Sequence, residues 1–348
     1  MSIAQHHLEK AVAIIGAYPQ KEPLALYVKQ ALAANKKHGS KDRKNIADAV
    51  FSYYRLGYTV NNWQVADAVV VALFLTRTNV GIWEPIIPAV LLPFLGLTPA
   101  EKWEVLKEHF PFFDKDNWMP TQHLLSTEIN YTTYCTQLLQ QPSTYLRIRP
   151  NKAAAVEAAL AQQQIPYTVV EPTCLAVAPN TAVQQVLTIN KQVVVQDWGS
   201  QQVATLFTWL PARYKTMPIQ IWDVCAASGG KTLLAIDYFQ QAKVFATDVR
   251  PQILRNYTTR MQEAGFSQYQ TLAVDVSAGN AKVTNRSFQL VMADVPCSGS
   301  GTWARTPEQL RICTPEKVES YVELQRKIAQ NSLKSVESGG HFLYITCS

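Results

Sequence analysis

The stretch Asp294-Val295-Pro296-Cys297-Ser298-Gly299-Ser300-Gly301 follows a short strand-like run, Leu290–Ala293, and sets a cysteine on a turn. A second cysteine closes another strand-like run, His341-Phe342-Leu343-Tyr344-Ile345-Thr346-Cys347. Parallel sheets place their chemistry at the carboxyl ends of the strands, so both thiols and the Asp294 carboxylate are expected at one edge. Together they would supply a nucleophile, a base and an orienting charge. Covalent attack on a pyrimidine ring is one of the few reactions that need this set.

The two runs belong to a repeating pattern that begins at about residue 206. Strand-like runs alternate there with helical stretches, and the runs are Ile219–Val224, Val244–Thr247, Thr271–Val274, Leu290–Ala293 and Phe342–Thr346. The last helical stretch has an apolar stripe from Val318 to Val336, and Gly339-Gly340 is expected to end it. Repeated strand–helix units require a parallel, doubly wound sheet, so residues 206–348 are predicted to form an α/β, Rossmann-like domain.

Upstream of this pattern, residues 1–140 are predicted to form an all-helical domain. Apolar residues from Leu24 to Leu32 recur at helical spacing, and Ser40-Lys41-Asp42-Arg43 opens another helical segment. Three prolines indicate a kinked or broken stretch further on: Pro85, Pro88 and Pro93.

Residues 141–205 are predicted to form a small α+β domain. Three segments have strand-like patterns and one is helix-prone; they are Tyr145–Arg149, Tyr167–Val170, Gln192–Gln196 and, for the helix, Ala153–Ala161.

The composition is that of a globular protein. Of 348 residues, 47% are hydrophobic, which excludes a disordered chain, and the net charge of +6 gives a mild bias towards polyanionic partners. Six cysteines lie far apart, without the close pairs of a zinc site, so no metal is expected. The N-terminus lacks a secretory pattern, and charged residues interrupt the most apolar region, 65–97. A cytoplasmic protein without a membrane span is therefore expected.

Each of the first four strand-like runs delivers an acid at or near its end: Asp223, Asp248, Asp275 and Asp294. After the first comes Val224-Cys225-Ala226-Ala227-Ser228-Gly229-Gly230-Lys231-Thr232, where glycines permit a tight turn and bring backbone N–H groups towards a ligand at a helix N-terminus. Gly230-Lys231-Thr232 mimics the end of a P-loop. However, that motif requires glycine at position 225, where this chain has Cys225, so a nucleoside triphosphate site is not expected.

The acids favour an adenosine-containing cofactor. A carboxylate at Asp248 would accept hydrogen bonds from two ribose hydroxyls, and Asp275 could bind an adenine amine. A single strand-end aspartate is more often a helix cap, but four in register with a glycine turn favour ligand binding. Nicotinamide cofactors also use this architecture, but their Gly-x-Gly-x-x-Gly fingerprint is absent after the first strand. S-adenosylmethionine fits better.

Taken together, these segments resemble the Sun/Fmu family of RNA cytosine carbon-5 methyltransferases. The turn 223–232 resembles the family's cofactor turn, with Ser228 where proline is usual, and the segments 294–301 and 344–348 resemble its Asp-x-Pro-Cys-Ser-Gly-x-Gly and Thr-Cys-Ser signatures. More weakly, segments 39–43 and 53–55 resemble the NusB-like helical domain of the bacterial ribosomal-RNA branch. Leu146-Arg147-Ile148 and Val195-Gln196-Asp197 resemble its small middle domain. The resemblance implies a class I methyltransferase fold in the last domain.

The resemblance also implies a role for each site residue. Cys347 would be the nucleophile, Cys297 would assist proton removal and product release, and Asp294 would hydrogen-bond the target base. The cofactor would be held by Cys225, Ala226, Ala227, Ser228, Gly229, Gly230, Lys231, Asp248, Asp275 and Asp294. Lys231 would pair with the cofactor carboxylate or with the base. Inert packing is the expectation for the other buried cysteines: Cys135, Cys174 and Cys313.

RNA is the expected partner, with ribosomal RNA favoured by the resemblance and transfer RNA left open; no obligate protein partner is evident. Because the target base must reach two thiols in a pocket, an unpaired or flipped-out base is expected. Basic side chains are candidates for phosphate contacts, although each alone is more often a surface charge: Lys36, Lys37, Lys41, Arg43, Lys44, Arg55, Arg147 and Arg149.

Two other functions compete with this one. A DNA cytosine methyltransferase would attack with the cysteine of its Pro-Cys motif and has no counterpart of Thr346-Cys347. A non-catalytic RNA-binding or assembly protein would bind RNA in a salt-dependent manner and transfer nothing. The family continues past Thr-Cys-Ser with a helix and strands, whereas this sequence ends at Ser348. Either a truncated form or a sheet without its closing strands is therefore expected, with Cys347 near a frayed end and activity impaired.

Overall fold

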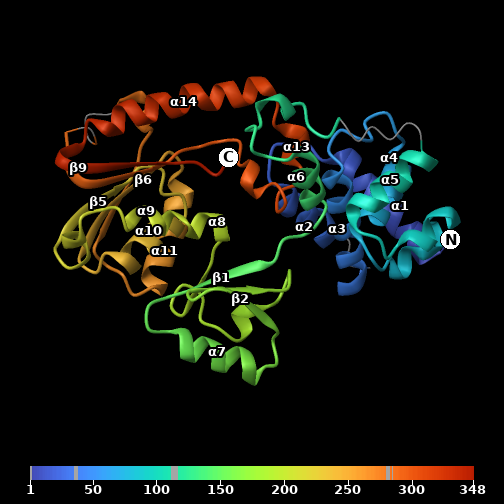
Figure 1. Cartoon of the computed structure of the whole chain (residues 1–348), viewed down its shortest axis with the longest axis horizontal. Helices are drawn as coiled ribbons and strands as arrows, with labels where there is room; N and C mark the ends of the chain where they lie inside the picture. The colour runs from blue at the N-terminus through green and yellow to red at the C-terminus, as the bar shows by residue number, and fades with distance from the viewer. Residues whose placement is uncertain (1, 35–37, 111–116, 280–282, 284) are drawn as a thin grey trace. The chain divides into compact units, whose positions relative to one another are not determined.

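The computed structural model describes residues 2–34, 38–110, 117–279, 283 and 285–348, and these form two compact units (Figure 1). The first unit contains Met1–Pro142 together with Thr302–Lys317, and the second contains Ser143–Gly301 together with Val318–Ser348. The segment 302–317 thus packs with the helical residues, although it lies within the range predicted for the α/β domain. The boundaries near 140 and 205 remain predictions.

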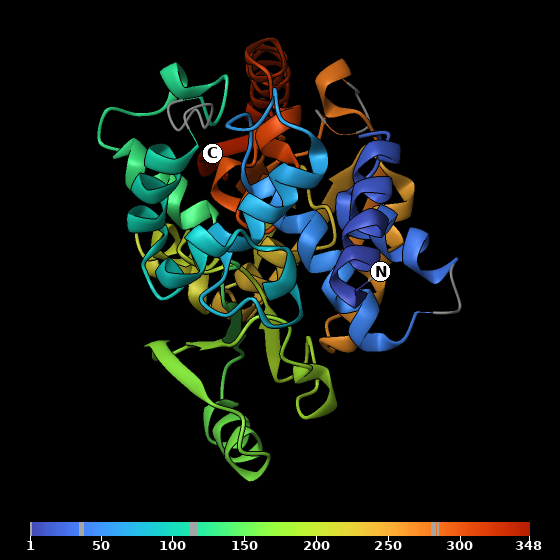
Figure 2. The same ribbon diagram turned by 90° about the vertical axis from the view of Figure 1, so that its right-hand side faces the viewer.

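The first unit is helical, as predicted, and its helices before residue 142 appear in blue to green in Figure 2. Its elements are α1 (Ile3–Ala17), α2 (Leu24–Ala33), α3 (Ser40–Arg55), α4 (Val65–Thr76), η1 (Gly81–Ile86), η2 (Ala89–Phe94), α5 (Pro99–His109), η3 (Gln122–Leu124), α6 (Tyr131–Leu138) and α13 (Gln309–Ile312). Prolines inside both η1 and η2 explain why this stretch forms short 3-10 turns instead of a long helix.

The segment 302–317 is anchored in the first unit by buried polar groups. Glu308 is 2% exposed and accepts a hydrogen bond from the backbone N–H of Leu24, so its carboxylate caps the N-terminus of α2. The Arg311 guanidinium lies over the Tyr53 ring, 4.7 Å from the centroid, and donates to the Gly57 carbonyl. These hydrogen bonds and the ring contact depend on direction, so they fix the position of segment 302–317 against α2 and α3.

Arg55 belongs to the same network, which corrects its assignment as an RNA contact. Its side chain is buried, and Nη1 donates to the carbonyls of Leu138, Gln140 and Ala304. A guanidinium occupied in this way stabilises the unit from within and has no surface to offer a phosphate.

The second unit contains the small module that the sequence predicts. Its elements are β1 (Thr144–Ile148), α7 (Ala153–Gln162), β2 (Tyr167–Glu171), β3 (Cys174–Val177), η4 (Val183–Gln185) and β4 (Val193–Val195). The strands pair antiparallel in the order β2-β3-β1-β4, and Val156 and Leu160 of α7 pack into the core beside Leu146.

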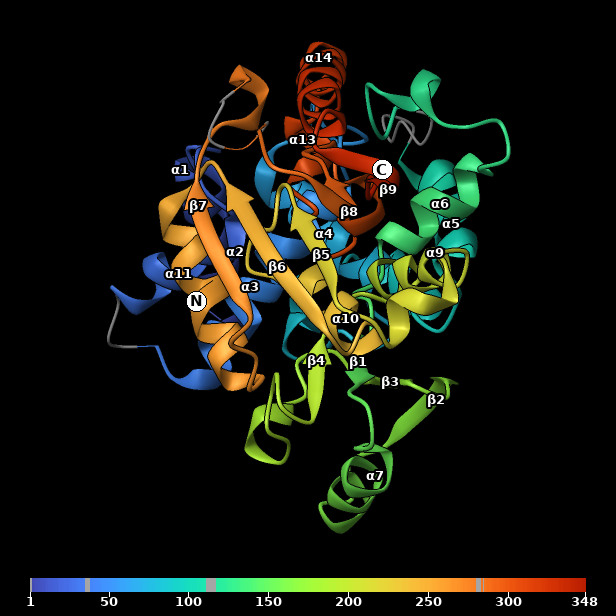
Figure 3. The ribbon, with the colours of Figure 1, turned by 90° about the vertical axis from the view of Figure 1, so that its left-hand side faces the viewer.

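The larger part of the second unit is a parallel sheet in the order β7-β6-β5-β8-β9 (Figure 3). Its strands are β5 (Ile219–Asp223), β6 (Ala242–Asp248), β7 (Tyr269–Ala273), β8 (Phe288–Asp294) and β9 (Val336–Ile345). The intervening elements are α8 (Trp198–Gln201), α9 (Val203–Phe207), η5 (Ala212–Lys215), α10 (Gly230–Tyr238), α11 (Pro251–Glu263), η6 (Val276–Ala278), η7 (Ser300–Thr302) and α14 (Pro315–Leu333).

Helices cover both faces of this sheet because its strands are apolar on both sides. Along β8, Leu290 and Met292 pack against the cluster that contains residues of α10 and α11, whereas Val291 and Ala293 pack against the cluster that contains Ile328 of α14. Strand order reverses between β5 and β8, so the predicted doubly wound α/β architecture is confirmed. Ligand sites are expected at the carboxyl ends of these two strands.

The predicted end of the last helix is wrong. α14 ends at Leu333, and Val336 already begins β9, which contains Gly339 and Gly340. The two glycines lie where the register between β8 and β9 shifts, and Gly339 has φ of +76°. They therefore serve an irregular strand instead of a helix terminus.

None of the helices among the described residues is long and apolar enough to cross a membrane.

We predict that Arg55→Met lowers the free energy of unfolding of the protein by roughly 2–4 kcal/mol, because buried carbonyls lose their donor. Denaturant titration measures this loss. Lys44→Met is the matched control, since Lys44 is exposed on the same helix, and a change within about 0.5 kcal/mol is expected there. Unchanged stability with weakened RNA binding in Arg55→Met would restore Arg55 as an RNA contact.

Candidate active site

The turn after β5 is shaped by residues with positive φ angles. Ala227 has φ of +46° and Gly229 has φ of +84°, and α10 begins directly after them at Gly230. A Cβ atom at position 229 would lie 2.7 Å from Tyr257 Cδ2 and 2.8 Å from Met261 Cε on α11. Glycine is therefore required at this position for two reasons: the positive φ angle and the close approach of α11. The result is a helix N-terminus presented at the edge of the sheet.

Asp223, at the end of β5, is a structural residue. It is 1% exposed, and its Oδ2 accepts a hydrogen bond from the Thr232 hydroxyl at 2.5 Å. Burial raises the pKa of Asp223 to about 7, although the Thr232 hydrogen bond opposes the shift. The acid thus ties the end of β5 to the first turn of α10.

Asp248, at the end of β6, lies against the turn 225–231, and its binding of ribose remains a prediction. Its Oδ2 accepts from the Ala227 backbone N–H at 3.0 Å, and both carboxylate oxygens accept from the Arg250 guanidinium. Burial alone would raise the pKa of Asp248, but the hydrogen bonds from Arg250 and Ala227 lower it, so the group is ionised. Arg250 has a side chain that is 60% exposed, and no pattern in the sequence predicts its position beside Asp248.

Asp275 lies just beyond β7, is exposed, and caps η6. Its Oδ1 accepts from both the backbone N–H and the hydroxyl of Ser277. The capping role considered from the sequence is thus observed for this acid. A contact with adenine remains a prediction.

Asp294, at the end of β8, forms an ion pair with Lys231 of α10. Lys231 Nζ lies 2.6 Å from Asp294 Oδ2, and the two side chains are 14% and 27% exposed. The pair spans the point where the strand order reverses. Lys231 therefore contacts a protein carboxylate in this structure. Its pairing with the cofactor carboxylate or with the target base remains a prediction.

The two cysteines meet at the same edge. Cys297 Sγ lies 3.3 Å from Cys347 Sγ. The turn and the strand end are also joined through the backbone, because the Gly301 N–H donates to the Cys347 carbonyl at 2.8 Å. A Cβ atom at position 301 would lie 2.8 Å from that carbonyl oxygen, so glycine is required there.

The thiols titrate as a coupled pair. A hydrogen bond from the Cys347 thiol lowers the pKa of Cys297 to about 5, although burial opposes the shift. The same interaction, together with burial, raises the pKa of Cys347. The pKa shifts favour a thiolate on Cys297 and a protonated Cys347, with the two sulfurs within hydrogen-bond distance of each other.

Gln325 of α14 is a residue that sequence reasoning missed. Its Nε2 donates to the Pro296 carbonyl at 2.7 Å, and its Oε1 accepts from the Tyr344 hydroxyl. It thereby connects β9 with the residue before Cys297. The only available signal was its polar place on a helix whose apolar face packs on the sheet, and most polar helix residues have no such contact.

The basic candidates separate into three groups. Arg147 and Arg149, predicted as RNA contacts, instead pair with Asp237 of α10, so both assignments are corrected. Lys41 and Lys44 are exposed and remain predictions, as does the half-buried Arg43. Lys36 and Lys37 lie outside the described residues.

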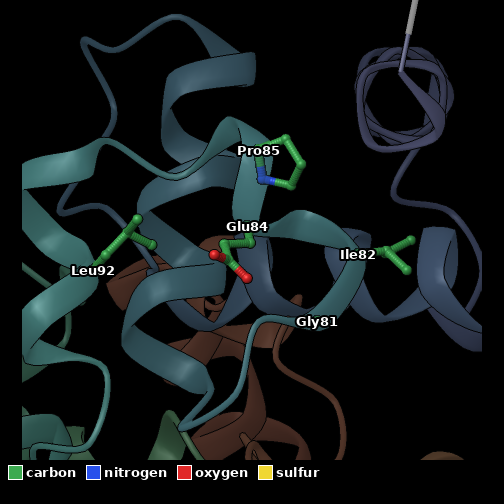
Figure 4. Close-up of a pocket in the computed structure, with 5 residues that line it drawn as sticks. All are labelled: Gly81, Ile82, Glu84, Pro85 and Leu92. Atoms are coloured by element: carbon green, nitrogen blue, oxygen red, sulfur yellow. The ribbon is translucent and has the colours of Figure 1, made fainter.

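The buried cysteines and the cavity of the first unit do not belong to the site at the sheet edge. Cys135, Cys174 and Cys313 are buried, as expected for packing, and burial raises the pKa of Cys135 to about 12. A cavity of about 410 Å³ in the first unit is lined by Gly81, Ile82, Glu84, Pro85 and Leu92, and Figure 4 shows Glu84 between Leu92 and Ile82. Among the described residues, no cluster of three or more His, Cys, Asp and Glu side chains could hold a metal.

We predict that Gly229→Ala lowers the free energy of unfolding by roughly 2–4 kcal/mol, because a left-handed φ costs about 1 kcal/mol and overpacking adds about 1–3 kcal/mol. Gly265→Ala is the matched control, since Gly265 has φ of +73° and nothing within 4 Å of its Cβ position. Denaturant midpoints of the two variants separate the backbone strain, present at both positions, from the steric crowding by α11, present only at position 229. Equal losses of stability in both variants would contradict the crowding.

A second prediction concerns pH. Because burial raises the pKa of Asp223 in the folded state from its ordinary value of 3.8 to about 7, the fold prefers the protonated acid. Its contribution to stability is complete below about pH 4 and is lost as pH rises through about 7. Asp223→Asn keeps an acceptor for Thr232 and has no charge, so the variant should gain stability relative to the wild type between pH 5 and pH 8. Identical pH dependence of the two denaturant midpoints would contradict a raised pKa.

Comparisons with known proteins agree with this geometry. Residues 211–348 match the family model "16S rRNA methyltransferase RsmB/F". A Synechocystis sp. protein named "Probable ribosomal RNA small subunit methyltransferase B" is 30% identical over 221 residues, covering 62% of this chain and 48% of the relative. Ribosomal RNA small subunit methyltransferase B of Xanthomonas campestris pv. campestris is 29% identical over 157 residues, covering 45% of this chain and 35% of the relative. The chain thus spans less than half the length of these relatives.

Two solved structures share the fold. The crystal structure of PH0851 has a TM-score of 0.68 at 17% identity, covering 100% of this chain and 86% of that one. NSun6 from Pyrococcus horikoshii, solved with SFG, has a TM-score of 0.50 at 14% identity, covering 62% of this chain and 79% of that one. The match over residues 211–348 leads to one conclusion: this part of the chain is similar to the 16S rRNA methyltransferase RsmB/F family, in agreement with the Sun/Fmu motifs that it contains.

Proposed function

We propose that this protein transfers a methyl group from S-adenosylmethionine to carbon 5 of a cytosine in RNA, through a covalent adduct with Cys347. The observation that carries the proposal is the 3.3 Å approach of Cys347 Sγ to Cys297 Sγ, beside the Lys231–Asp294 ion pair. A thiol pair with one ionised sulfur provides a nucleophile and a base within reach of one ring. Few other reactions would use both.

The residues at the sheet edge fit S-adenosylmethionine. Asp248 is an ionised acceptor at the end of β6, and ribose hydroxyls can replace the largely exposed Arg250 guanidinium on its two oxygens. The turn 225–231 would hold the remainder of the cofactor, with Asp275 at the adenine end and Asp294 near the methyl group. Bound S-adenosylmethionine supplies an electrophilic methyl group.

Activation of the nucleophile follows from the coupled thiols. The Cys297 thiolate accepts the proton of Cys347 across the short S···S distance, which leaves Cys347 as the thiolate. Cys347 then adds to carbon 6 of the cytosine, and the electron pair of the 5,6 double bond moves into the ring. Asp294 hydrogen-bonds the ring nitrogen or amine and stabilises the charge that develops, while Lys231 holds Asp294 in place.

The adduct makes carbon 5 nucleophilic enough to form the bond to the methyl group, while the methyl–sulfur bond of the cofactor breaks and its electron pair stays on that sulfur. Cys297 gives its proton to solvent and, as a thiolate again, accepts the proton from carbon 5. The electrons of that C–H bond restore the 5,6 double bond as the bond from carbon 6 to sulfur breaks, and the pair returns to Cys347. The proton on Cys297 then returns to Cys347, so one proton is released to solvent in total and the thiols end as they began.

The names of the relatives favour ribosomal RNA of the small subunit as the substrate. A base within a duplex cannot reach two thiols at a sheet edge, so an unpaired or flipped-out cytosine is required. The exposed Lys41 and Lys44 of α3 are candidates for phosphate contacts in the first unit. Transfer RNA is the alternative substrate and DNA a less favoured one.

The two thiols should give different phenotypes when each is replaced. Cys347→Ala should abolish both methylation and the covalent protein–RNA adduct, because the nucleophile is lost. Cys297→Ala should accumulate the adduct, because release from carbon 6 needs its base. Denaturing gel electrophoresis with labelled RNA, in the presence of S-adenosylmethionine, measures both outcomes. Cys225→Ala, a replacement of the third cysteine near the turn, should trap no adduct.

Opposite phenotypes would exchange the two roles. Methyl transfer to DNA oligomers but not to RNA would favour the DNA alternative. Tight binding of S-adenosylmethionine in calorimetry, with no transfer to any RNA, would favour a non-catalytic RNA-binding protein.

A further inference from the structure

Both ends of α10 are held by the small module of the second unit. At its last turn, Asp237 accepts from Arg147 Nη1 at 2.5 Å and from Arg149 Nη2 at 2.7 Å, both on or next to β1. At its first residue, the Gly230 carbonyl accepts from Gln196 Nε2 at 3.4 Å. Figure 3 shows β1 and β4 beside the end of α10. The helix that follows the cofactor turn therefore has its position set from outside its own sheet.

The contacts at the two ends form one network. Gln196 Oε1 accepts from Arg147 Nε at 2.8 Å, so the residue that holds Gly230 is fixed by the arginine that holds Asp237. The Gln196 carbonyl in turn accepts from Gln201 of α8. Movement of β1 relative to α10 would thus disturb the first and the last turn of that helix together.

The position of Asp237 is unfavourable without its partners. Its side chain is 8% exposed, and it lies in the last turn of a helix, where the dipole disfavours negative charge. An isolated buried carboxylate would be costly, and two arginines with three hydrogen bonds offset that cost. Because the partners come from the small module, α10 is stable in this place only when the module is docked.

The same module holds α11. Arg149 Nη1 donates to the Ala264 carbonyl at the C-terminal cap, and Asn190 Nδ2 donates to Glu263 at 2.7 Å. α10 follows the cofactor turn and α11 follows Asp248. The module thus contacts the two helices that are connected to the two cofactor-binding strand ends.

We propose that the small module is a clamp for the cofactor site, and that Gln196 and Arg147 are positioning residues that set the cofactor turn and Lys231. The proposal rests on the function proposed above and identifies how its cofactor site is held. Gln196 contacts the carbonyl of the residue directly before Lys231, and Lys231 holds Asp294, so the clamp acts on the reacting groups through a short chain of contacts.

The test compares Gln196→Met with Leu160→Ala in the full chain. Gln196→Met keeps the volume of the side chain and removes its hydrogen bonds, whereas Leu160→Ala opens the core of the same module, away from α10. We expect Gln196→Met to weaken S-adenosylmethionine binding in calorimetry roughly threefold to tenfold, the loss expected for one or two hydrogen bonds. It should raise KM for the cofactor with little change in kcat. Leu160→Ala should lower the denaturant midpoint more and leave cofactor affinity unchanged.

Hydrogen exchange of the protein without cofactor provides a second, independent measurement. Amides of residues 230–232 should exchange faster in Gln196→Met than in the wild type, and not in Leu160→Ala. Equal exchange and equal affinity in Gln196→Met and wild type would overturn the clamp, as would equal effects of both variants. If the wild type binds no S-adenosylmethionine, the proposed function fails, and the exchange comparison still decides the clamp.

Discussion

The parallel pairing of β8 with β9 is the constraint on which the site depends. Asp294 lies opposite Ile345 in this register, so the two chains leave the sheet side by side at their carboxyl ends. Cys297 and Cys347 then follow at similar distances from the sheet edge, and the Gly301 N–H closes the gap by binding the Cys347 carbonyl. A shift of one residue would turn one sulfur to the other face of the sheet.

The three acids at this edge of the sheet differ in burial and in partners, and therefore in their charge. Asp223 is sealed and prefers its proton, Asp248 is ionised by its donors, and Asp294 pairs with Lys231. Asp223 is the most buried of the three because β5 lies at the centre of the sheet and α10 covers its end. The side chain of Asp248 is only 5% exposed, but its main partner is the exposed Arg250, which a ligand could replace.

The two arginines of β1 and Arg55 of α3 illustrate why basic residues are difficult to assign from a sequence. The sequence around a lysine or arginine does not show whether its side chain faces solvent or a buried carboxylate. Arg147 and Arg149 find Asp237 across a distance in sequence that no periodicity predicts, and Arg55 finds three carbonyls. Long-range partners of this kind are set by packing, which local patterns do not encode.

The sequence by itself determined the α/β class, the strand ends that carry Asp223, Asp248 and Asp294, and the two cysteine turns, because strand periodicity and glycine turns are local properties. It misplaced the start of β9, since Gly339-Gly340 is as compatible with a strand irregularity as with a helix end. Only the tertiary structure decided that the two sulfurs meet and that Arg250 donates hydrogen bonds to both carboxylate oxygens of Asp248. It also decided that the small module contacts both ends of α10. Each of these depends on contacts between segments far apart in the chain, which are fixed by how the strands pair and the helices pack.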